Sequence, residues 1–401
     1  MSFSYPEIRL RPNTERLLIK GHPWVYSGAV ALSHPGASAG AVVDVISSTD
    51  RFIGRGYFNP DSEIAVRMLH RQRDRDVDAE FVHQVITDAV RLRQEHPELG
   101  EAGACRLIHG ESDGLPGLIV DRYGEWLVVQ LHTAGVETLR AWVVDALQQI
   151  LQPRGIYERS DVGTRRADGL CDRPTGVLAG EEPPELIEFR EGNVELVADV
   201  RRGQKTGFFL DQRDNRLLMG RFAGGRSVLN LFSYTGSFSA HAARAGATRV
   251  VDVDIALGAL RTGRLNHERN GGGSLSTSLN TDVFSLAEQW SDRGKQFGVV
   301  VVDPPSLARR NRQAKQAMGV YTKLNRNAMR LVEDGGYLLT CSCSTRVSEE
   351  DFFQIVRRAA SGARVRARVL DIGHHSADHP VDPAFPEGRY LKSLLVRVFR
   401  D

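Results

Sequence analysis

Two cysteines at the end of one apolar segment are the residues whose types and spacing most directly suggest chemistry. Cys341 and Cys343 lie in LLTCSCSTR, residues 338–346, with a single serine between them. Such thiols could bind a metal, form half of a disulfide, pack inertly, or act as a nucleophile. We expect the two side chains to face opposite sides of a strand, which would exclude a shared metal ion and a mutual bridge. The chain contains no C-x-x-C pattern, so we predict no metal site.

Three carboxylates also follow strand-like segments. Asp254 ends TRVVDVD, Asp282 follows a short strand, and Asp303 ends FGVVVVD before Pro304 and Pro305. Ligands of open parallel sheets bind beyond the carboxyl ends of the strands, so we expect these acids in one site. Asp254 and Asp282 could accept hydrogen bonds from a ribose and an adenine, or they could instead cap helices. The two rigid prolines beside Asp303 favour a functional role there.

A glycine-bearing turn follows the first strand of the same series. The segment NLFSYTGSFS, residues 230–239, allows a ligand to approach the backbone closely. It lacks the G-x-G-x-x-G fingerprint of dinucleotide binding, which disfavours a nicotinamide dehydrogenase. An adenosyl ligand without phosphate, S-adenosylmethionine, fits these strand ends better. The predicted cofactor-binding residues are Asn230, Phe232, Ser233, Tyr234, Thr235, Gly236, Asp254, Asp282 and Asp303.

The elements that must position these residues follow three patterns. Residues 1–72 are rich in short strands and turns, and AVVDVIS and EIAVRML are the clearest strands. Residues 73–190 mix two amphipathic helices with a strand pair, and EEPPELIEFREG closes this block with turn residues. Strands and helices alternate over residues 191–401, which is typical of a parallel sheet covered on both faces. We therefore predict an α/β protein of three domains with these boundaries.

Composition narrows the functional class further. The chain has 401 residues, a formal net charge of +2 and an apolar fraction of 41%, which suits globular domains rather than one large basic surface. Four cysteines do not make a disulfide framework. The start, MSFSYPEIRL, has no secretory pattern, and no apolar run is long enough to span a membrane. We predict a cytoplasmic protein.

Motifs along nearly the whole chain resemble the bacterial large-subunit rRNA cytosine-5 methyltransferases of the RlmI type. They are GHPWVYSGAV, ESDGLPGLIVDRYG, IYERSD, KTGFFLDQRDNR, LNLFSYTGSFS, VDPPS, TCSCS and DHPVDPAFPEGRYLK. The resemblance implies an N-terminal PUA domain, a small RNA-binding β-barrel, followed by a central α+β domain and a class I (Rossmann-like) methyltransferase domain. It also implies that the loop 232–236, with Asp254 and Asp282, holds S-adenosylmethionine.

The resemblance matches Cys343 to the cysteine of the family's SCS motif. It implies formation of 5-methylcytidine in 23S rRNA. Cytosine C5 becomes reactive when a thiolate adds to C6, and we expect Asp303 to hold the N3/N4 edge of the base during this reaction. Inert packing is the alternative for Cys343, and we expect it for Cys341. Two further hypotheses remain: methylation of an exocyclic amino group, which needs no thiol, and an RNA-binding protein that has lost catalysis.

The expected partner is large-subunit rRNA, and a homodimer is one arrangement we consider. A target base must leave its stack to reach such a pocket, while cations hold the phosphates. Cations beside the VDPPS motif and polar residues before the cofactor strand are the predicted RNA contacts. They are Lys205, Gln212, Arg309, Arg310, Arg312 and Lys315.

Overall fold

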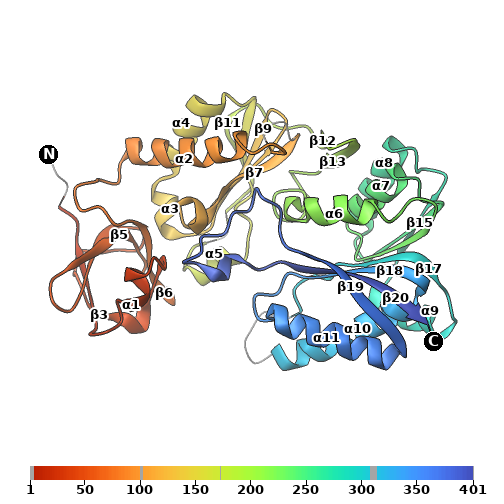
Figure 1. Ribbon diagram of the computed structural model, residues 1–401. Coiled ribbons are helices and arrows are strands. Elements are labelled where there is room, and N and C mark those ends of the chain that lie inside the picture. The colour runs from red at the N-terminus through yellow and green to blue at the C-terminus, as the bar shows by residue number, and fades with distance from the viewer. Residues whose placement is uncertain (1–3, 100–102, 172, 308–313, 401) are drawn as a thin grey trace. The chain divides into compact units, whose positions relative to one another are not determined.

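The computed structural model describes residues 4–99, 103–171, 173–307 and 314–400, which form two compact units (Figure 1). The first unit contains Met1–Ile187, Ala198–Phe208 and Ala377–Gly388, and the second contains the remaining segments of the chain. The segment Ala377–Gly388 therefore belongs with residues almost two hundred positions away. The division into three domains near residues 72 and 190 stays a prediction.

The first sheet of unit 1 has six strands in the order β2-β6-β5-β4-β1-β3. Its core is formed by alternate side chains, such as Val43 and Val45, which are fully buried. The two strands predicted in this block are confirmed as β4 and β6. The elements are β1 (Glu7–Leu10), α1 (Arg16–Ile19), β2 (Trp24–Tyr26), β3 (Val30–Ser33), β4 (Val42–Ile46), β5 (Phe52–Phe58) and β6 (Ile64–His70).

The second sheet of unit 1 has five strands in the order β11-β10-β9-β8-β7. Apolar side chains of its helices α2 and α4 pack on the strands, as the periodicity predicted. The elements are α2 (Ala79–Gln94), β7 (Ala104–His109), β8 (Leu118–Tyr123), β9 (Trp126–Leu131), α3 (Ala134–Thr138), α4 (Arg140–Leu151), β10 (Gly155–Glu158), α5 (Thr164–Ala167) and β11 (Gly176–Gly180).

Unit 2 is built on a seven-stranded sheet in the order β16-β15-β14-β17-β18-β20-β19. The first five of these strands are parallel, and β20 runs antiparallel to both of its neighbours. The strands are β14 (Ser227–Leu231), β15 (Arg249–Asp254), β16 (Ser276–Asn280), β17 (Phe297–Val302), β18 (Val332–Ser342), β19 (Val365–Gly373) and β20 (Lys392–Arg400). The helices are α6 (Arg213–Gly220), α7 (Ser237–Arg244), α8 (Leu257–Arg269), α9 (Val283–Asp292), α10 (Ala314–Arg330) and α11 (Glu349–Ala363).

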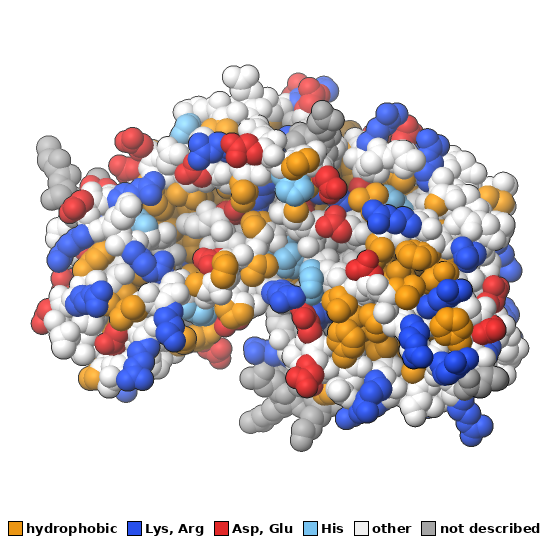
Figure 2. All heavy atoms as spheres, viewed as in Figure 1, with side chains coloured by type: hydrophobic (Ala, Val, Ile, Leu, Met, Phe, Trp, Pro, Cys, Tyr) orange, Lys and Arg blue, Asp and Glu red, His pale blue; other side chains and the backbone are white. Residues whose placement is uncertain are grey.

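Helices cover both faces of this sheet, as the alternating pattern predicted. On β17, Val300 and Val302 pack with side chains of α9, α10 and α11, whereas Val299 and Val301 pack with side chains of α6 and α7. Every residue of β17 is therefore buried, which explains its uninterrupted apolar sequence. In Figure 2 hydrophobic side chains gather in the region where Figure 1 places the edge strand β19, and the large apolar side chains exposed on β19 are Val369, Leu370 and Ile372.

One segment expected to consist of turn residues is instead a strand. EEPPELIEFREG contains β12 (Ile187–Glu191), which pairs with β13 (Val194–Ala198) in a two-stranded hairpin. The buried side chains of Ile187 and Phe189 alternate with the exposed ones of Glu188 and Arg190. This period of two is the signal of a half-buried strand, and the surrounding glutamates and prolines obscured it. Among the described residues, none of the helices is both long and apolar enough to cross a membrane.

Candidate active site

Strand register brings the predicted residues to one edge of the unit 2 sheet. Leu231, the last residue of β14, pairs with Val253 on one side and with Val302 on the other. The loop after β14 therefore begins between Asp254 and Asp303, the residues that follow those two positions. On β18, Thr340 pairs with Val302, so the cysteines follow at the same edge.

The loop after β14 has an unusual backbone. Phe232 and Tyr234 have positive φ values of 62° and 48°, and Gly236 has a φ of 65°. Residues other than glycine rarely adopt this left-handed conformation, and those that do tend to cluster at ligand sites. The loop is held by hydrogen bonds from the Ser233 amide to the Val253 carbonyl, at 3.1 Å, and from the Gly236 amide to the Ser233 carbonyl, at 2.8 Å.

A buried polar cluster that sequence reasoning missed supports this loop. The Asp252 carboxylate accepts hydrogen bonds from Ser239 Oγ, at 2.6 Å, and from Asn230 Nδ2, at 3.1 Å. Its other oxygen lies 2.6 Å from Nε2 of His267. A Cβ atom on Gly236 would lie 2.9 Å from that oxygen, so the loop needs glycine for space as well as for its φ value. Asp252 lies two residues before Asp254. Only its burial distinguishes this carboxylate, which supports the loop, from the one predicted to bind the ligand.

The two acids predicted for the adenosyl group differ in their surroundings. Asp254 accepts hydrogen bonds from the backbone amides of Tyr234 and Ala256, both at 2.8 Å. It is not the N-cap of α8, because that position is Ala256. Asp282 is the N-cap of α9, and its carboxylate accepts from the Ser285 amide at 2.8 Å. That hydrogen bond lowers the pKa of Asp282, which is exposed.

Cys343 lies over the turn that follows β17. Its thiol donates a hydrogen bond to the carbonyl oxygen of Pro304, with 3.9 Å between Sγ and oxygen. Both Cys343 and Asp303 are half-buried, whereas Pro304 is buried. A thiol, a carboxylate and a rigid turn therefore meet at the edge of the sheet where the loop after β14 begins.

Cys341 is fully buried, as expected for a packing residue. Burial raises the pKa of its thiol well above the ordinary value, the charge of Asp303 adds to this effect, and a hydrogen bond with Gln212 opposes it. The expectation that the two thiols face opposite sides of the strand is wrong. Both pack on the cluster formed with α6 and α7, because residues two apart on a strand share a face. None of the four cysteines forms a disulfide, and the described residues hold no cluster of three or more His, Cys, Asp or Glu able to bind a metal.

Comparisons with known proteins decide the family. Residues 161–397 match the S-adenosylmethionine-dependent methyltransferase family, and residues 8–71 match the PUA-like domain family. The chain is 41% identical to ribosomal RNA large subunit methyltransferase I of Shewanella denitrificans over 98% of this chain and 99% of the relative. It is 38% identical to the protein of the same name from Erwinia tasmaniensis, over 97% and 98%. The chain belongs to this methyltransferase family.

Solved structures agree on the fold of the methyltransferase. A protein from Streptococcus mutans described as a SAM-dependent methyltransferase is 22% identical, with a TM-score of 0.82 over 98% of this chain and 99% of the other. A methyltransferase structure described as complexed with SAH is 23% identical, with a TM-score of 0.84 over the same shares. The predicted class I methyltransferase fold, preceded by a PUA-like domain, is confirmed.

The loop after β14 fits the cofactor of this family. Three buried oxygens at the end of β14 and in the loop after it have no hydrogen-bond partner within the described part of the methyltransferase: Asn230 Oδ1, Ser233 Oγ and Thr235 Oγ1. Buried polar atoms are nearly always paired, so these oxygens are available to a polar ligand. The ring of Tyr234 meets that of Phe209 edge-on at 5.1 Å between centroids and adds an apolar wall beside the loop.

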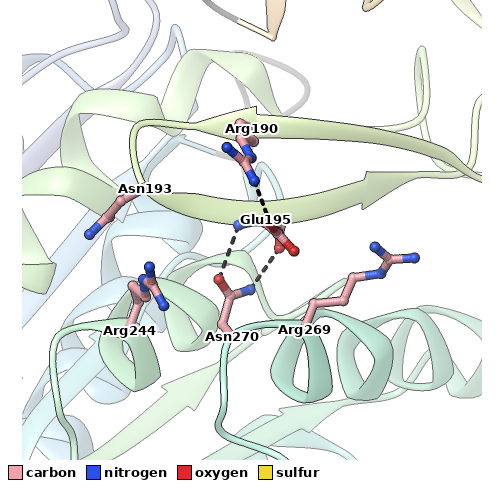
Figure 3. A pocket seen from close by; sticks show the side chains of 6 residues that line it. All are labelled: Arg190, Asn193, Glu195, Arg244, Arg269 and Asn270. Carbon is pink, nitrogen blue, oxygen red and sulfur yellow. Dashed lines mark hydrogen bonds and ion pairs between the residues drawn. The ribbon is translucent and has the colours of Figure 1, made fainter.

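A cavity of about 180 Å³ elsewhere on the methyltransferase is not part of this site. Figure 3 shows Arg190, Asn193 and Glu195 of the β12–β13 hairpin facing Arg244 and Asn270, at the ends of α7 and α8. Because these helices run back from the carboxyl ends of parallel strands, the cavity lies at the opposite edge of the sheet. Each of the two helices has a basic side chain in its last turn. The helix dipole favours a positive charge there, so these side chains need no bound ligand to explain them.

The residues predicted to contact RNA are only partly described. Arg309, Arg310 and Arg312 lie outside the described residues, and Lys315 lies in the first turn of α10. Gln212 of the methyltransferase is buried and accepts a hydrogen bond from Asn215 at 2.6 Å, beside Cys341. Lys205 is exposed in unit 1, with a positive φ of 55°.

Proposed function

We propose that this methyltransferase forms 5-methylcytidine in 23S rRNA, with Cys343 as the nucleophile. The contact between the Cys343 thiol and the Pro304 carbonyl carries the proposal, because it places a half-buried sulfur next to Asp303. Relatives named ribosomal RNA large subunit methyltransferase I support rRNA as the substrate. By the same argument we place the protein in the cytoplasm. The predicted homodimer stays a prediction.

The cofactor residues in this proposal are those of the predicted site. The unpaired oxygens of Asn230, Ser233 and Thr235 bond to polar groups of the cofactor, and Gly236 allows its close approach. Asp254 accepts from the ribose hydroxyls and Asp282 from the adenine amino group. When bound, S-adenosylmethionine supplies an electrophilic methyl group carried on a sulfonium.

The chain's own groups make the base reactive. The Cys343 thiolate adds to cytosine C6, forming a C–S bond, and the C5=C6 electron pair makes C5 nucleophilic. The carboxyl group of Asp303 holds the N3/N4 edge of the flipped base. It takes up a proton from solvent when the base binds and donates that proton to N3, where negative charge develops as the thiolate adds. After C5 has gained its methyl group, loss of the C5 proton to a base expels the thiolate and restores the aromatic ring.

The RNA contacts remain part of the proposal. Lys205 and Lys315, with Arg309, Arg310 and Arg312, are assigned to phosphates. Gln212 is assigned to the border of the active site rather than to a phosphate, because it is buried beside Cys341.

A fluorinated substrate tests the thiol mechanism directly. In 23S rRNA containing 5-fluorocytidine, fluorine replaces the proton whose loss must expel the thiolate, so the adduct persists. We expect a covalent protein–RNA complex with the wild-type chain and with Cys341→Ala, and none with Cys343→Ala. Tritiated-methyl transfer followed by nucleoside analysis identifies the product on ordinary rRNA.

The same experiment distinguishes the proposed function from a second candidate function. An acid followed by two prolines, Asp303-Pro304-Pro305, also suits methylation of an exocyclic amino group, which uses no thiol. Full methylation by Cys343→Ala, with an N-methylated nucleoside as the product, would replace the primary proposal with this one.

A further inference from the structure

Lys392 is a buried cation at the strand end that carries Cys343. It is the first residue of β20, where it pairs with Ser342 across the antiparallel β18–β20 ladder. Its side chain is 5% exposed, and its Nζ donates a hydrogen bond to the carbonyl oxygen of Ser344 at 2.5 Å. Lys392 therefore contacts the residues on both sides of Cys343, one through strand pairing and the other through its ammonium group.

A structural role alone explains this lysine poorly. Taking an ammonium group out of water is costly, and one backbone carbonyl returns only part of that cost. A neutral side chain of similar length would fill the same space without the penalty. The buried charge is therefore best explained by a partner that gains from it.

The negative groups that act on Lys392 are Cys343, as the thiolate, and Glu349. Burial lowers the pKa of Lys392 to about 8, and both negative groups oppose that decrease. Of the other ionisable groups around the thiol, Tyr321 and Cys341 are neutral near pH 7, because burial raises the pKa of each. Asp303 acts electrostatically on both of them and brings negative charge, which by itself would disfavour a thiolate.

We infer that Lys392 is a positioning residue that fixes the Cys343–Ser344 backbone and, through its charge, favours the thiolate of Cys343. The inference rests on the proposed function for its purpose, but it concerns the thiol itself. The Cys343 thiol loses its proton to solvent, Lys392 stays protonated, and no bond forms between them. The cation offsets the charge of Asp303, so that a thiolate and a carboxylate coexist in one site.

Alkylation measures the thiolate without RNA or cofactor. We would follow the rate of iodoacetamide modification of Cys343 against pH, by peptide mass spectrometry, in the wild-type chain, Lys392→Met and Lys392→Arg. An opposite charge within about 4–6 Å shifts a thiol's titration by about one unit or more. In Lys392→Met the midpoint should therefore rise by about one pH unit, and the rate at pH 7 should fall about tenfold. Lys392→Arg should keep the wild-type midpoint, and exposed Cys171 is the internal control.

An unchanged midpoint in Lys392→Met overturns the inference, whatever the methylation assay finds. If Lys392→Met does not fold, Lys392→Arg still decides through its alkylation profile. A guanidinium stays charged throughout the titration of the thiol, so the midpoint in Lys392→Arg should equal that of the wild-type chain. A midpoint that rises by about one pH unit in Lys392→Arg would show that charge at this position does not favour the thiolate and would overturn the inference. The alkylation midpoint tests this inference, whereas 5-methylcytidine formation tests the proposed function. Because the two are measured separately, failure of one can be told from failure of the other.

Discussion

The carboxylate of Asp254 accepts a hydrogen bond from the backbone amide of Tyr234, with 2.8 Å between Oδ2 and the nitrogen. Its other oxygen accepts from the Ala256 amide at the same distance. The end of the second strand thus fixes the loop that follows the first strand. A ligand that contacts both elements meets a surface already ordered, which reduces the entropic cost of binding.

Asp254→Asn should weaken cofactor binding about tenfold, because an amide has one acceptor oxygen for two backbone donors. Isothermal titration with S-adenosylhomocysteine measures the effect. Asp292→Asn, an exposed change at the end of α9, should leave Kd unaltered. Equal affinity in the two variants would remove Asp254 from the cofactor site.

Gly236→Ala should cost about 1–3 kcal/mol of unfolding free energy, because its φ of 65° is unfavourable for alanine and its Cβ would press on Asp252. Affinity for S-adenosylhomocysteine should decrease with it. The matched control is Gly258→Ala in α8, where a Cβ meets nothing within 4 Å and alanine favours the helix. Urea unfolding compares the two, and equal midpoints would contradict the strain argument.

The strand ends were predictable because the buried strands of a parallel sheet can be recognised in the sequence alone. Each buried strand is a run such as FGVVVVD, and topology then places the residue after each run at one edge. Asp254, Asp303 and Cys343 follow such runs, so their proximity needed no tertiary information. Cys341 could also be recognised as a packing residue, since it lies inside the apolar run.

The features that escaped prediction depend on contacts between distant residues. His267 becomes a partner of Asp252 only when α8 packs beside β15, and nothing in its own helix marks it. The positive φ values of Phe232 and Tyr234 are imposed by the loop, because neither residue prefers them. The return of Ala377–Gly388 to unit 1 likewise follows from packing rather than from any local pattern.

Glu191 should be a strong stabiliser of the β12–β13 hairpin. It is buried, its carboxylate bonds to Arg216 at 2.6 Å through both oxygens, and His241 lies 2.9 Å away. Glu191→Gln removes the negative charge that faces the buried guanidinium of Arg216 and should cost about 3 kcal/mol. Urea unfolding at pH 7 measures this cost. Glu188→Gln, an exposed change on the same hairpin, should alter stability by less than about 0.5 kcal/mol.

The effect of Glu191 should depend on pH in one direction. Burial alone would raise the pKa of Glu191, but the charge of Arg216 and hydrogen bonds from Arg216 and His241 hold it well below its ordinary value. The stabilisation is therefore complete above the unfolded value of 4.5 and is lost as the pH falls toward the folded one. The difference between wild type and Glu191→Gln should shrink between pH 5 and about pH 3. A difference that grows in that range would show that the ion pair is not its source.

The two cysteines of β18 should separate stability from catalysis. Cys341→Ala removes a fully buried sulfur and should cost about 1 kcal/mol while leaving methylation within about threefold of wild type. Cys343→Ala changes a half-buried side chain and should cost less than about 0.5 kcal/mol, yet lower the methylation rate by about 10³-fold or more. Thermal unfolding and single-turnover methyl transfer on the same preparations provide both measurements. A loss of activity that tracks the loss of stability across the two variants would make Cys343 a packing residue like its neighbour, because a nucleophile is needed for its sulfur and not for its volume.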